Sequence, residues 1–211
     1  MIVLINPNST VSMTDAMVRT AQDVAPGVKV VGWTSHDGPP AIQGPEDGDA
    51  SVPPLLELVA KASELGARAV IIGCFDDTGL AQARAIATCP VIGIGQAAYH
   101  MAVLSGARFS VVTTLAVSVP ILEDNIRHYG LWTHLGRVRA SGVPVLDLER
   151  DPDAAASRVL EEIADAARED DVNSIVLGCA GMVDIPARAT ELTGLRIIDG
   201  VRAAVQFSAL M

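Results

Sequence analysis

The chain has 211 residues, and its 25 acidic side chains outnumber 15 Lys and Arg, which gives a formal net charge of −10. Half of the residues are hydrophobic, so the chain can bury a core and does not belong to the disordered proteins. The acidic balance argues against nucleic-acid binding, because phosphate groups need a basic surface. It argues equally against binding to an anionic membrane.

The first residues and the three cysteines indicate a cellular compartment. The chain begins Met-Ile-Val-Leu-Ile-Asn-Pro, without the basic segment of a signal peptide, and no apolar run is long enough to span a membrane. Cys74, Cys89 and Cys179 are odd in number and lack CxxC spacing, which is untypical of a disulfide framework or a zinc site. We therefore expect a cytoplasmic protein without a metal site.

Short runs rich in Val and Ile alternate with longer amphipathic segments along the first half of the chain. Such apolar runs are typical of a parallel sheet that is covered on both faces. We expect strands at residues 1–5, 28–33, 69–73 and 91–94. Apolar residues recur at helical spacing over residues 13–24 and 55–65, and the second of these helices is expected to begin after Ser51, with prolines in its first turn.

A long irregular segment, residues 34–50, separates the second predicted strand from the second predicted helix. It is rich in glycine and proline, as in Gly38-Pro39-Pro40 and Gln43-Gly44-Pro45. Irregular segments of this length are commonly lids or binding loops. We expect this one either to move over a binding site or to pack rigidly at its edge, and residues 141–151 occupy a related place in the second half.

The second half of the chain repeats the alternation. We expect strands at residues 109–113, 137–140, 174–177 and 195–198. The clearest helix runs over residues 153–168, with Asp151 as its cap and Pro152 in its first turn. Strands that alternate with helices in this way predict the α/β class.

The two halves share one register, with an offset of 105 residues. At this offset Ile71-Ile72-Gly73-Cys74 aligns with Val176-Leu177-Gly178-Cys179, Gly95 with Gly200, and Asn8-Ser9 with Thr113-Thr114. The repeat predicts two similar α/β halves, 1–97 and 98–211, each with a four-stranded parallel sheet. We expect a pseudo-twofold to relate them and the active site to lie in the cleft between them. The C-terminal helix is a candidate for packing back on the first half.

Cys74 and Cys179 occupy matching positions of this repeat, each at the end of a predicted central strand. The carboxyl edge of an open α/β sheet is where ligands bind, and a helix N-terminus at that edge lowers the pKa of a thiol. A single free cysteine is commonly just a small buried residue. Two at equivalent positions instead favour a pair of thiols on either side of one cleft.

Two equivalent acid/base groups around one cavity suit the inversion of a stereocentre. One group removes a proton from one face of a carbon, and the other returns a proton to the opposite face. No metal or organic cofactor is required if a neighbouring carbonyl activates that carbon. Asp76 and Thr78 follow Cys74 closely; they either orient a thiol or the substrate, or the acidic pair Asp76-Asp77 caps the next helix.

Three motifs in combination resemble the Asp/Glu/hydantoin racemase superfamily, and within it the hydantoin racemases. They are Ile5-Asn6-Pro7-Asn8-Ser9-Thr10, Gly73-Cys74-Phe75-Asp76-Asp77-Thr78-Gly79-Leu80 and Leu177-Gly178-Cys179-Ala180-Gly181-Met182. The resemblance extends over essentially the whole chain. It implies two Rossmann-like halves and a cofactor-independent racemase that transfers protons through two cysteines.

Carried over by position, the resemblance implies that Cys74 and Cys179 are the two catalytic thiols. With Thr78 added for its closeness to Cys74, the expected substrate-binding residues are Asn8, Ser9, Phe75, Asp76, Thr78, Thr113, Thr114, Ala180 and Gly181. The chain has Asp76-Asp77-Thr78 where many relatives known as allantoin racemases carry Gly-Asp-Pro. This departure bears on the substrate and leaves the chemistry unchanged.

We therefore predict a racemase of 5-substituted hydantoins that acts on a small molecule and forms a homo-oligomer. Allantoin racemase is the nearest alternative. An aspartate or glutamate racemase needs cationic partners for a further carboxylate, but only Arg84 and Arg188 lie near the cysteine motifs, both within the following helices. A two-lobed binding protein would not need a thiol in both halves, and a related decarboxylase would need only one of them.

Overall fold

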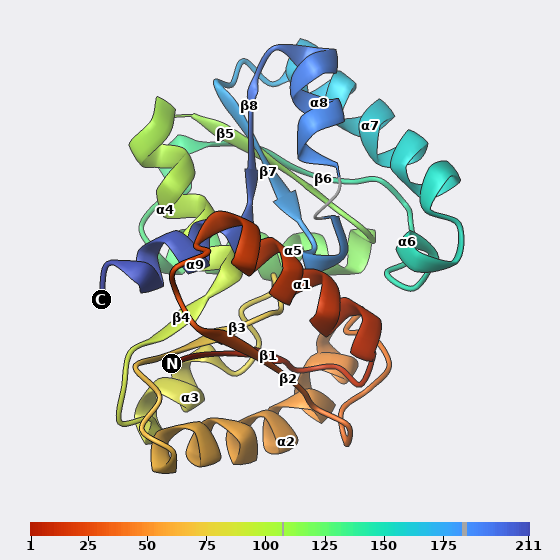
Figure 1. Cartoon of the computed structure of the whole chain (residues 1–211). Helices are drawn as coiled ribbons and strands as arrows, with labels where there is room; N and C mark the ends of the chain where they lie inside the picture. Colours follow the sequence, from red (N-terminus) through yellow and green to blue (C-terminus); the bar gives the residue numbers. More distant parts are fainter. Residues whose placement is uncertain (107, 183–184) are drawn as a thin grey trace.

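The computed structural model describes residues 1–106, 108–182 and 185–211, which form two sheets one above the other (Figure 1). The first sheet has the order β2-β1-β3-β4, with β1 (Ile2–Asn6), β2 (Val30–Thr34), β3 (Ala69–Ile72) and β4 (Val91–Gly93). The second has the order β6-β5-β7-β8, with β5 (Phe109–Thr113), β6 (Leu135–Ala140), β7 (Ser174–Gly178) and β8 (Arg196–Asp199). All of these neighbouring strands pair in parallel.

This topology confirms the predicted α/β class with two parallel four-stranded sheets. The strand order is the same in both sheets, and β7 and β8 begin 105 residues after β3 and β4. The offset of 105 residues therefore holds for these two pairs of strands. β5 begins 107 residues after β1, so the predicted equivalence of Asn8-Ser9 with Thr113-Thr114 is wrong by two residues. The division at residue 97 falls inside α4 (Ile94–Gly106) and stays a proposal.

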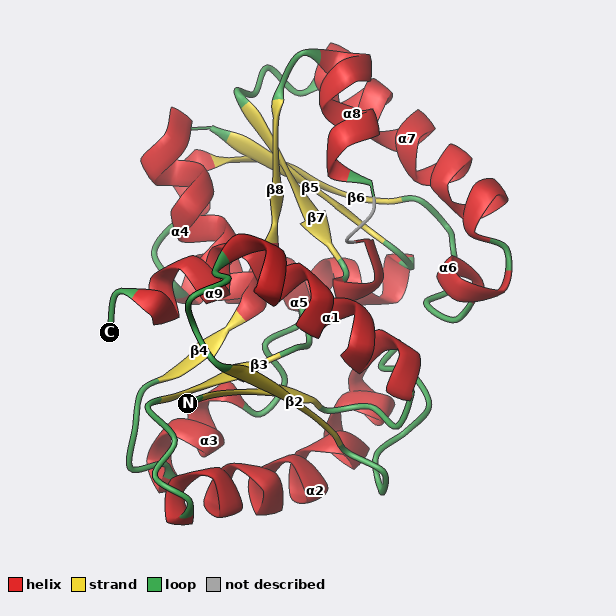
Figure 2. Ribbon diagram, in the orientation of Figure 1, coloured by secondary structure: helices red, strands yellow, loops and turns green. Residues whose placement is uncertain are grey.

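Three helices lie between the sheets and join them through one core (Figure 2). They are α1 (Val11–Val24), α4 and α9 (Gly200–Ala209). The core combines side chains of the first sheet such as Leu4, of the second sheet such as Phe109, and of the intervening helices such as Met17 and Tyr99. α9 also contacts α1 and β3, so the C-terminal helix packs on elements of the first half.

Most of the remaining helices cover the outer faces or connect strands, whereas the fifth helix in chain order adds Leu122 and Ile126 to the core between the sheets. The remaining helices are α2 (Pro45–Glu64), α3 (Leu80–Ile86), α5 (Val119–His128), α6 (Asp147–Arg150), α7 (Pro152–Glu169) and α8 (Pro186–Thr193), with short 3-10 turns η1 (Ala116–Ser118), η2 (Trp132–His134) and η3 (Ala180–Met182). Asp151 caps α7 as predicted, because its Oδ1 accepts a hydrogen bond from the Ala154 N–H at 3.2 Å. None of the described helices combines the length and apolar character of a membrane span.

The predicted start of the second helix is wrong. α2 begins at Pro45 and not after Ser51, so only residues 35–44 connect β2 to α2. Pro45 occupies the first helical position, where a missing N–H removes no helical hydrogen bond. Pro53-Pro54 lie inside the helix, where each proline costs a hydrogen bond, but the buried Leu55 and Val59 hold this segment against the first sheet.

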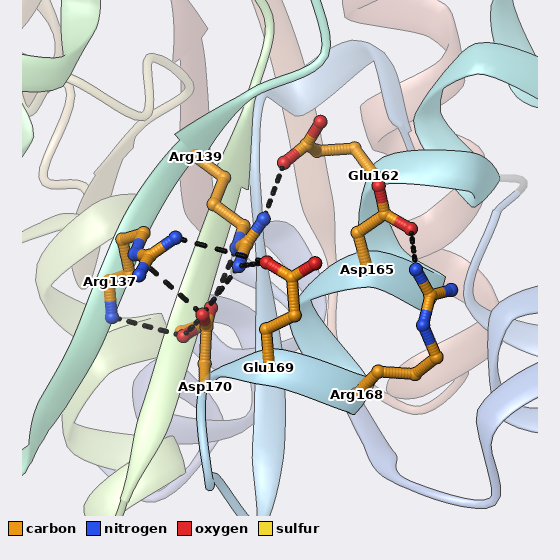
Figure 3. Close-up of polar contacts among 8 residues, drawn as sticks. Arg137, Arg139, Glu162, Asp165, Arg168, Glu169 and Asp170 are labelled. Atoms are coloured by element: carbon orange, nitrogen blue, oxygen red, sulfur yellow. Dashed lines mark hydrogen bonds and ion pairs between the residues drawn. The ribbon is translucent and has the colours of Figure 1, made fainter.

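Arginine side chains of the second half form a cluster of ion pairs near the end of α7 (Figure 3). Arg139 of β6 lies 3.1 Å from Glu162, 2.7 Å from Glu169 and 2.6 Å from Asp170. Asp170 also accepts a hydrogen bond from Ser110 Oγ at 2.7 Å, near the start of β5. The cluster therefore ties β6 to the end of α7.

Candidate active site

A cavity of about 40 Å³ lies at the carboxyl ends of β3 and β7, and both Cys74 and Cys179 line it. The two cysteines come from different sheets, so the fold brings the repeated positions to one place. The residues that line the cavity are Asn8, Met13, Ile42, Gly73, Cys74, Phe75, Asp76, Thr114, Ser118, Val145, Gly178, Cys179, Ala180 and Gly181.

Three of the predicted site residues, Ser9, Thr78 and Thr113, support the cavity from behind. The Ser9 N–H donates to the Pro39 carbonyl at 2.9 Å, which ties the end of β1 to the loop 35–44. Thr113 Oγ1 donates to the Gly178 carbonyl at 2.9 Å, next to Cys179. The other predicted residues lie in the cavity wall.

Cys74 follows β3, and its position depends on two close contacts. Its Sγ lies 3.4 Å from Thr78 Oγ1, within hydrogen-bond distance for a sulfur atom. Gly73 precedes it because a Cβ there would lie 2.7 Å from Met17 Sδ and 3.2 Å from the Ile5 carbonyl. The strand therefore passes under α1 without a side chain at this point.

Cys179 follows β7 directly and is held by its own turn. Its Sγ accepts a hydrogen bond from the Gly181 N–H at 3.4 Å. At Gly178, a Cβ would lie 2.9 Å from the Thr113 Cα, so only glycine allows β5 and β7 to end this close together. The glycine before each cysteine thus has a steric reason in each half.

Burial raises the pKa of both thiols. The pKa of Cys74 lies well above its usual range because of burial and the nearby Asp76 carboxylate, and burial raises that of Cys179 to about 12. The expectation that a helix N-terminus lowers these pKa values is wrong. α3 begins only at Leu80, and Cys179 is followed by a short 3-10 turn. In the free protein at neutral pH, both groups are therefore thiols.

Asp77 caps a different helix from the one expected. It is buried with a φ of 51°, and its carboxylate accepts hydrogen bonds from the Gly95 N–H at 3.0 Å, the Gln96 N–H at 2.7 Å and the Tyr129 hydroxyl at 2.8 Å. The first two donors belong to the first turn of α4, whereas the N-cap of α3 is Gly79. Burial raises the pKa of Asp77 to about 7, and the three donors oppose that rise. The loop after Cys74 is thus fixed to α4.

Asp76 is the one charged residue among the described residues that line the cavity. Its carboxylate accepts a hydrogen bond from Ser118 Oγ at 3.5 Å, and its backbone carbonyl accepts one from Asn125 Nδ2 at 2.8 Å. Burial raises its pKa to about 6. The cavity therefore combines two thiols and one carboxyl group with walls of small and apolar side chains.

A sequence profile of the Asp/Glu/hydantoin racemase family matches residues 2–208. The chain belongs to the Asp/Glu/hydantoin racemase family. It is 46% identical over 206 residues to a hydantoin racemase from Rhizobium meliloti, covering 97% of this chain and 86% of that protein. It is 36% identical to a hydantoin racemase from Pseudomonas sp. (strain NS671), covering 97% and 83% of the two chains.

Among solved structures, this racemase-family chain is similar to the allantoin racemase from Klebsiella pneumoniae. The TM-score is 0.95 at 36% identity, covering 99% of this chain and 86% of the other. The fold and the resemblance inferred from the motifs are therefore confirmed over nearly the whole chain.

Six residues that line this racemase-family cavity were not among the predicted site residues: Met13, Ile42, Gly73, Ser118, Val145 and Gly178. Ile42 and Val145 belong to the two irregular segments that the sequence marked, but nothing in those segments distinguished them from their neighbours. Met13 lies in α1 and Ser118 in the turn η1, and neither belongs to a motif that the sequence distinguished.

Metal ligation has no side-chain basis in the described residues. Within residues 1–106, 108–182 and 185–211, no three His, Cys, Asp or Glu side chains are grouped so that they could hold a metal ion.

The raised thiol pKa values predict slow alkylation that accelerates with pH. The rate at which iodoacetamide modifies Cys74 and Cys179 should rise about tenfold per pH unit from pH 7 to pH 10, because only the thiolate reacts. Cys89, which is less buried and has a less raised pKa, should react faster at pH 7 and serves as the internal control. Trypsin separates Cys74 from Cys89 at Arg84, so mass spectrometry reports each rate. Alkylation rates of Cys74 and Cys179 that do not change with pH would contradict their raised pKa values.

Proposed function

We propose that the protein is a cofactor-independent racemase that interconverts the enantiomers of 5-substituted hydantoins. The observation that carries this proposal is that two thiols from equivalent positions of the two sheets line one cavity. A carbon held between them has one acid/base group available for each face. Proton transfer at a carbon next to a carbonyl needs such a pair and no further reagent.

In the proposed reaction, one cysteine as thiolate removes the proton at C5, and the other as thiol returns a proton to the opposite face. The roles exchange for the other enantiomer. Backbone N–H groups after Cys74 and Cys179 would hold the ring carbonyls and stabilise the enolate charge, as donors of an oxyanion hole do. Both groups are thiols in the free protein at neutral pH, so the proposed reaction also requires that one thiol releases its proton before it can act as the base.

The cavity wall supports a ring substrate over a free acidic amino acid. No Lys or Arg is among its described lining residues, and Arg84 instead donates to the Val91 carbonyl at 3.0 Å. An aspartate or glutamate would bring a second carboxylate with no cation to receive it. Two relatives named hydantoin racemase favour a hydantoin, and the similar structure named allantoin racemase makes allantoin the second candidate.

A polarimetric screen tests this function. Enantiopure 5-substituted hydantoins, allantoin, aspartate and glutamate are incubated with the protein, without added cofactor and with EDTA present. We expect optical rotation to decay with the hydantoins at a rate proportional to protein concentration. A two-lobed binding protein would bind a hydantoin and leave its rotation unchanged, and that result would refute the proposal.

We also propose that the loop 35–44 opens to admit the substrate. A cavity of about 40 Å³ has room for only a few water molecules and is too small for a five-membered ring with a substituent. Ile42 of this loop lines the cavity, and Gln43 Oε1 accepts a hydrogen bond from the Val145 N–H at 2.8 Å. That bond joins the loop of the first half to the segment 141–146 of the second.

Replacing Gln43 by alanine should loosen this closure, because the Val145 N–H loses its acceptor. We expect amide hydrogen exchange at Val145 and within residues 35–44 to accelerate by about tenfold, because one hydrogen bond stabilises the closed state by about 1 kcal/mol or slightly more. Gln206→Ala on the exposed face of α9 is the matched control. Unchanged exchange in Gln43→Ala would show that the loop is a rigid wall.

We further propose a cytoplasmic homo-oligomer. The three cysteines are free, which supports a reducing compartment. Leu104 and Met211 are 76% and 61% exposed and line an apolar hollow beside α4 and α9, a surface that a second copy would cover. Sedimentation velocity measures the assembly against the 22.0 kDa of one chain.

A further inference from the structure

Asp76 has no ionic partner among the residues that the structure describes. Its carboxylate accepts one hydrogen bond, from Ser118 Oγ at 3.5 Å, which is at the outer limit of hydrogen-bond distance. None of the ion pairs formed by the described residues includes it. A half-buried carboxylate without a cation is costly, and a ligand with a cationic group would supply the missing partner at this cavity wall.

The neighbouring Asp77 shows how the protein satisfies a buried carboxylate when its role is structural. Asp77 receives three donors within 3.0 Å, from Gly95, Gln96 and Tyr129, and does not line the cavity. Asp76 receives one distant donor and does line it. The two adjacent carboxyl groups therefore have different functions.

Asp76 also breaks the symmetry of the site. The residue 105 positions later is Gly181, which has no side chain, so the charge is present in one half only. Proton transfer to and from the two faces uses what both halves share, namely the thiols and the backbone groups after them. The C5 substituent is the part of a 5-substituted hydantoin that lies outside the ring. We therefore expect a charge that is present in one half only to act on this substituent.

We propose that Asp76 selects hydantoins whose C5 substituent carries a cationic amine or guanidinium group, through an ion pair between that cation and the Asp76 carboxylate. The inference rests on the proposed racemase function and adds its substrate class. Such a cation would also offset the Asp76 charge, which adds to burial in raising the pKa of Cys74 and Cys179. The carboxyl pKa of about 6 means that Asp76 is ionised at pH 8, where the experiment is done.

The test compares four hydantoins whose C5 substituents have equal numbers of heavy atoms and carry a positive charge, a negative charge or no charge. They are 3-aminopropyl, ureido, isobutyl and carboxymethyl, and kcat/KM for racemisation is measured for each with the wild type and with Asp76→Asn. The wild type should prefer 3-aminopropyl and reject carboxymethyl. Asp76→Asn should lower the ratio of kcat/KM for the 3-aminopropyl compound to that for the isobutyl compound by about tenfold, because it removes one hydrogen bond between charged groups. The corresponding ratio for carboxymethyl over isobutyl should rise.

Ratios between substrates remove any effect of the variant on the thiols themselves, because that effect is common to all four. Asp15→Asn on the exposed face of α1 removes the same charge outside the cavity and should leave the ratios unchanged. Protection of Cys74 and Cys179 from iodoacetamide by the 3-aminopropyl hydantoin gives a binding readout that needs no turnover, and it should weaken in Asp76→Asn.

Two results would overturn the inference alone. One is an equal change for all four substrates in Asp76→Asn, which would place Asp76 on the ring or the thiols. The other is a wild type that racemises isobutyl or carboxymethyl hydantoin better than the 3-aminopropyl compound. Failure to racemise any of the four is a different result, which removes the proposed function and this inference with it.

Discussion

Replacing either Cys74 or Cys179 by alanine is expected to lower kcat/KM for racemisation by about 10³-fold, within the range that general acid/base groups contribute. Each variant leaves one face of the stereocentre without a proton donor or acceptor. The third cysteine cannot substitute for the lost thiol, because Cys89 does not line the cavity. Chiral chromatography of a slowly self-racemising hydantoin measures the rate.

Each of these variants should still exchange the C5 proton on one face of the substrate. The remaining thiol still removes and returns a proton on its own face, so each variant should exchange the C5 proton of one enantiomer in D2O with retention of configuration. Because the two cysteines come from opposite halves, the two variants should prefer opposite enantiomers. Proton NMR follows the exchange, and chiral chromatography follows the configuration.

Cys89→Ala is the matched control for these variants and should keep wild-type activity. If both active-site variants exchanged the same enantiomer, or if one of them racemised normally, the two-face assignment would be wrong. A double variant that lacks Cys74 and Cys179 should neither racemise nor exchange. Binding of the hydantoin by that double variant remains compatible with the proposal, since the thiols supply protons and not the main contacts to the ring.

Replacing Gly95 by alanine is expected to damage both the fold and the site. A Cβ at this position would overlap the Phe75 carbonyl and lie 2.9 Å from Asp77 Oδ2. The first neighbour is backbone, so relief requires the segment that carries Cys74 to move. We expect the free energy of unfolding to fall by about 1–3 kcal/mol, as overpacking does, and kcat/KM to fall by about 10²-fold, as misplacement of a reacting group by about 1 Å does.

Urea denaturation and the racemisation assay measure these two effects separately. Gly27→Ala is the matched control, because a Cβ there has no neighbour within 4 Å and the residue is exposed. Wild-type activity in Gly95→Ala would show that the segment after Cys74 tolerates displacement, and the role given to Asp77 and α4 in holding it would then be wrong.

The class of fold and the pair of cysteines could both be predicted from the order of the residues. The fold class follows from local patterns, namely apolar runs of strand length and helical periodicity, and the pair follows from a repeat that places Cys74 and Cys179 after equivalent strands. The cap of α7 was equally readable, since Asp151 and Pro152 act within one turn of the helix. Interactions between neighbouring residues leave their signature in the order of the residues.

Features that depend on contacts between distant segments could not be predicted from the sequence. The carboxylate of Asp77 caps α4, eighteen residues further along the chain, and no spacing rule distinguishes this from a cap on α3. The start of α2 depends on packing against the first sheet, which compensates for two prolines inside the helix. The pKa of each thiol depends on how completely both halves bury it, and that burial raises the pKa where the local pattern predicted a decrease. Desolvation is a property of everything that surrounds a group, so it exists only once the two sheets have come together.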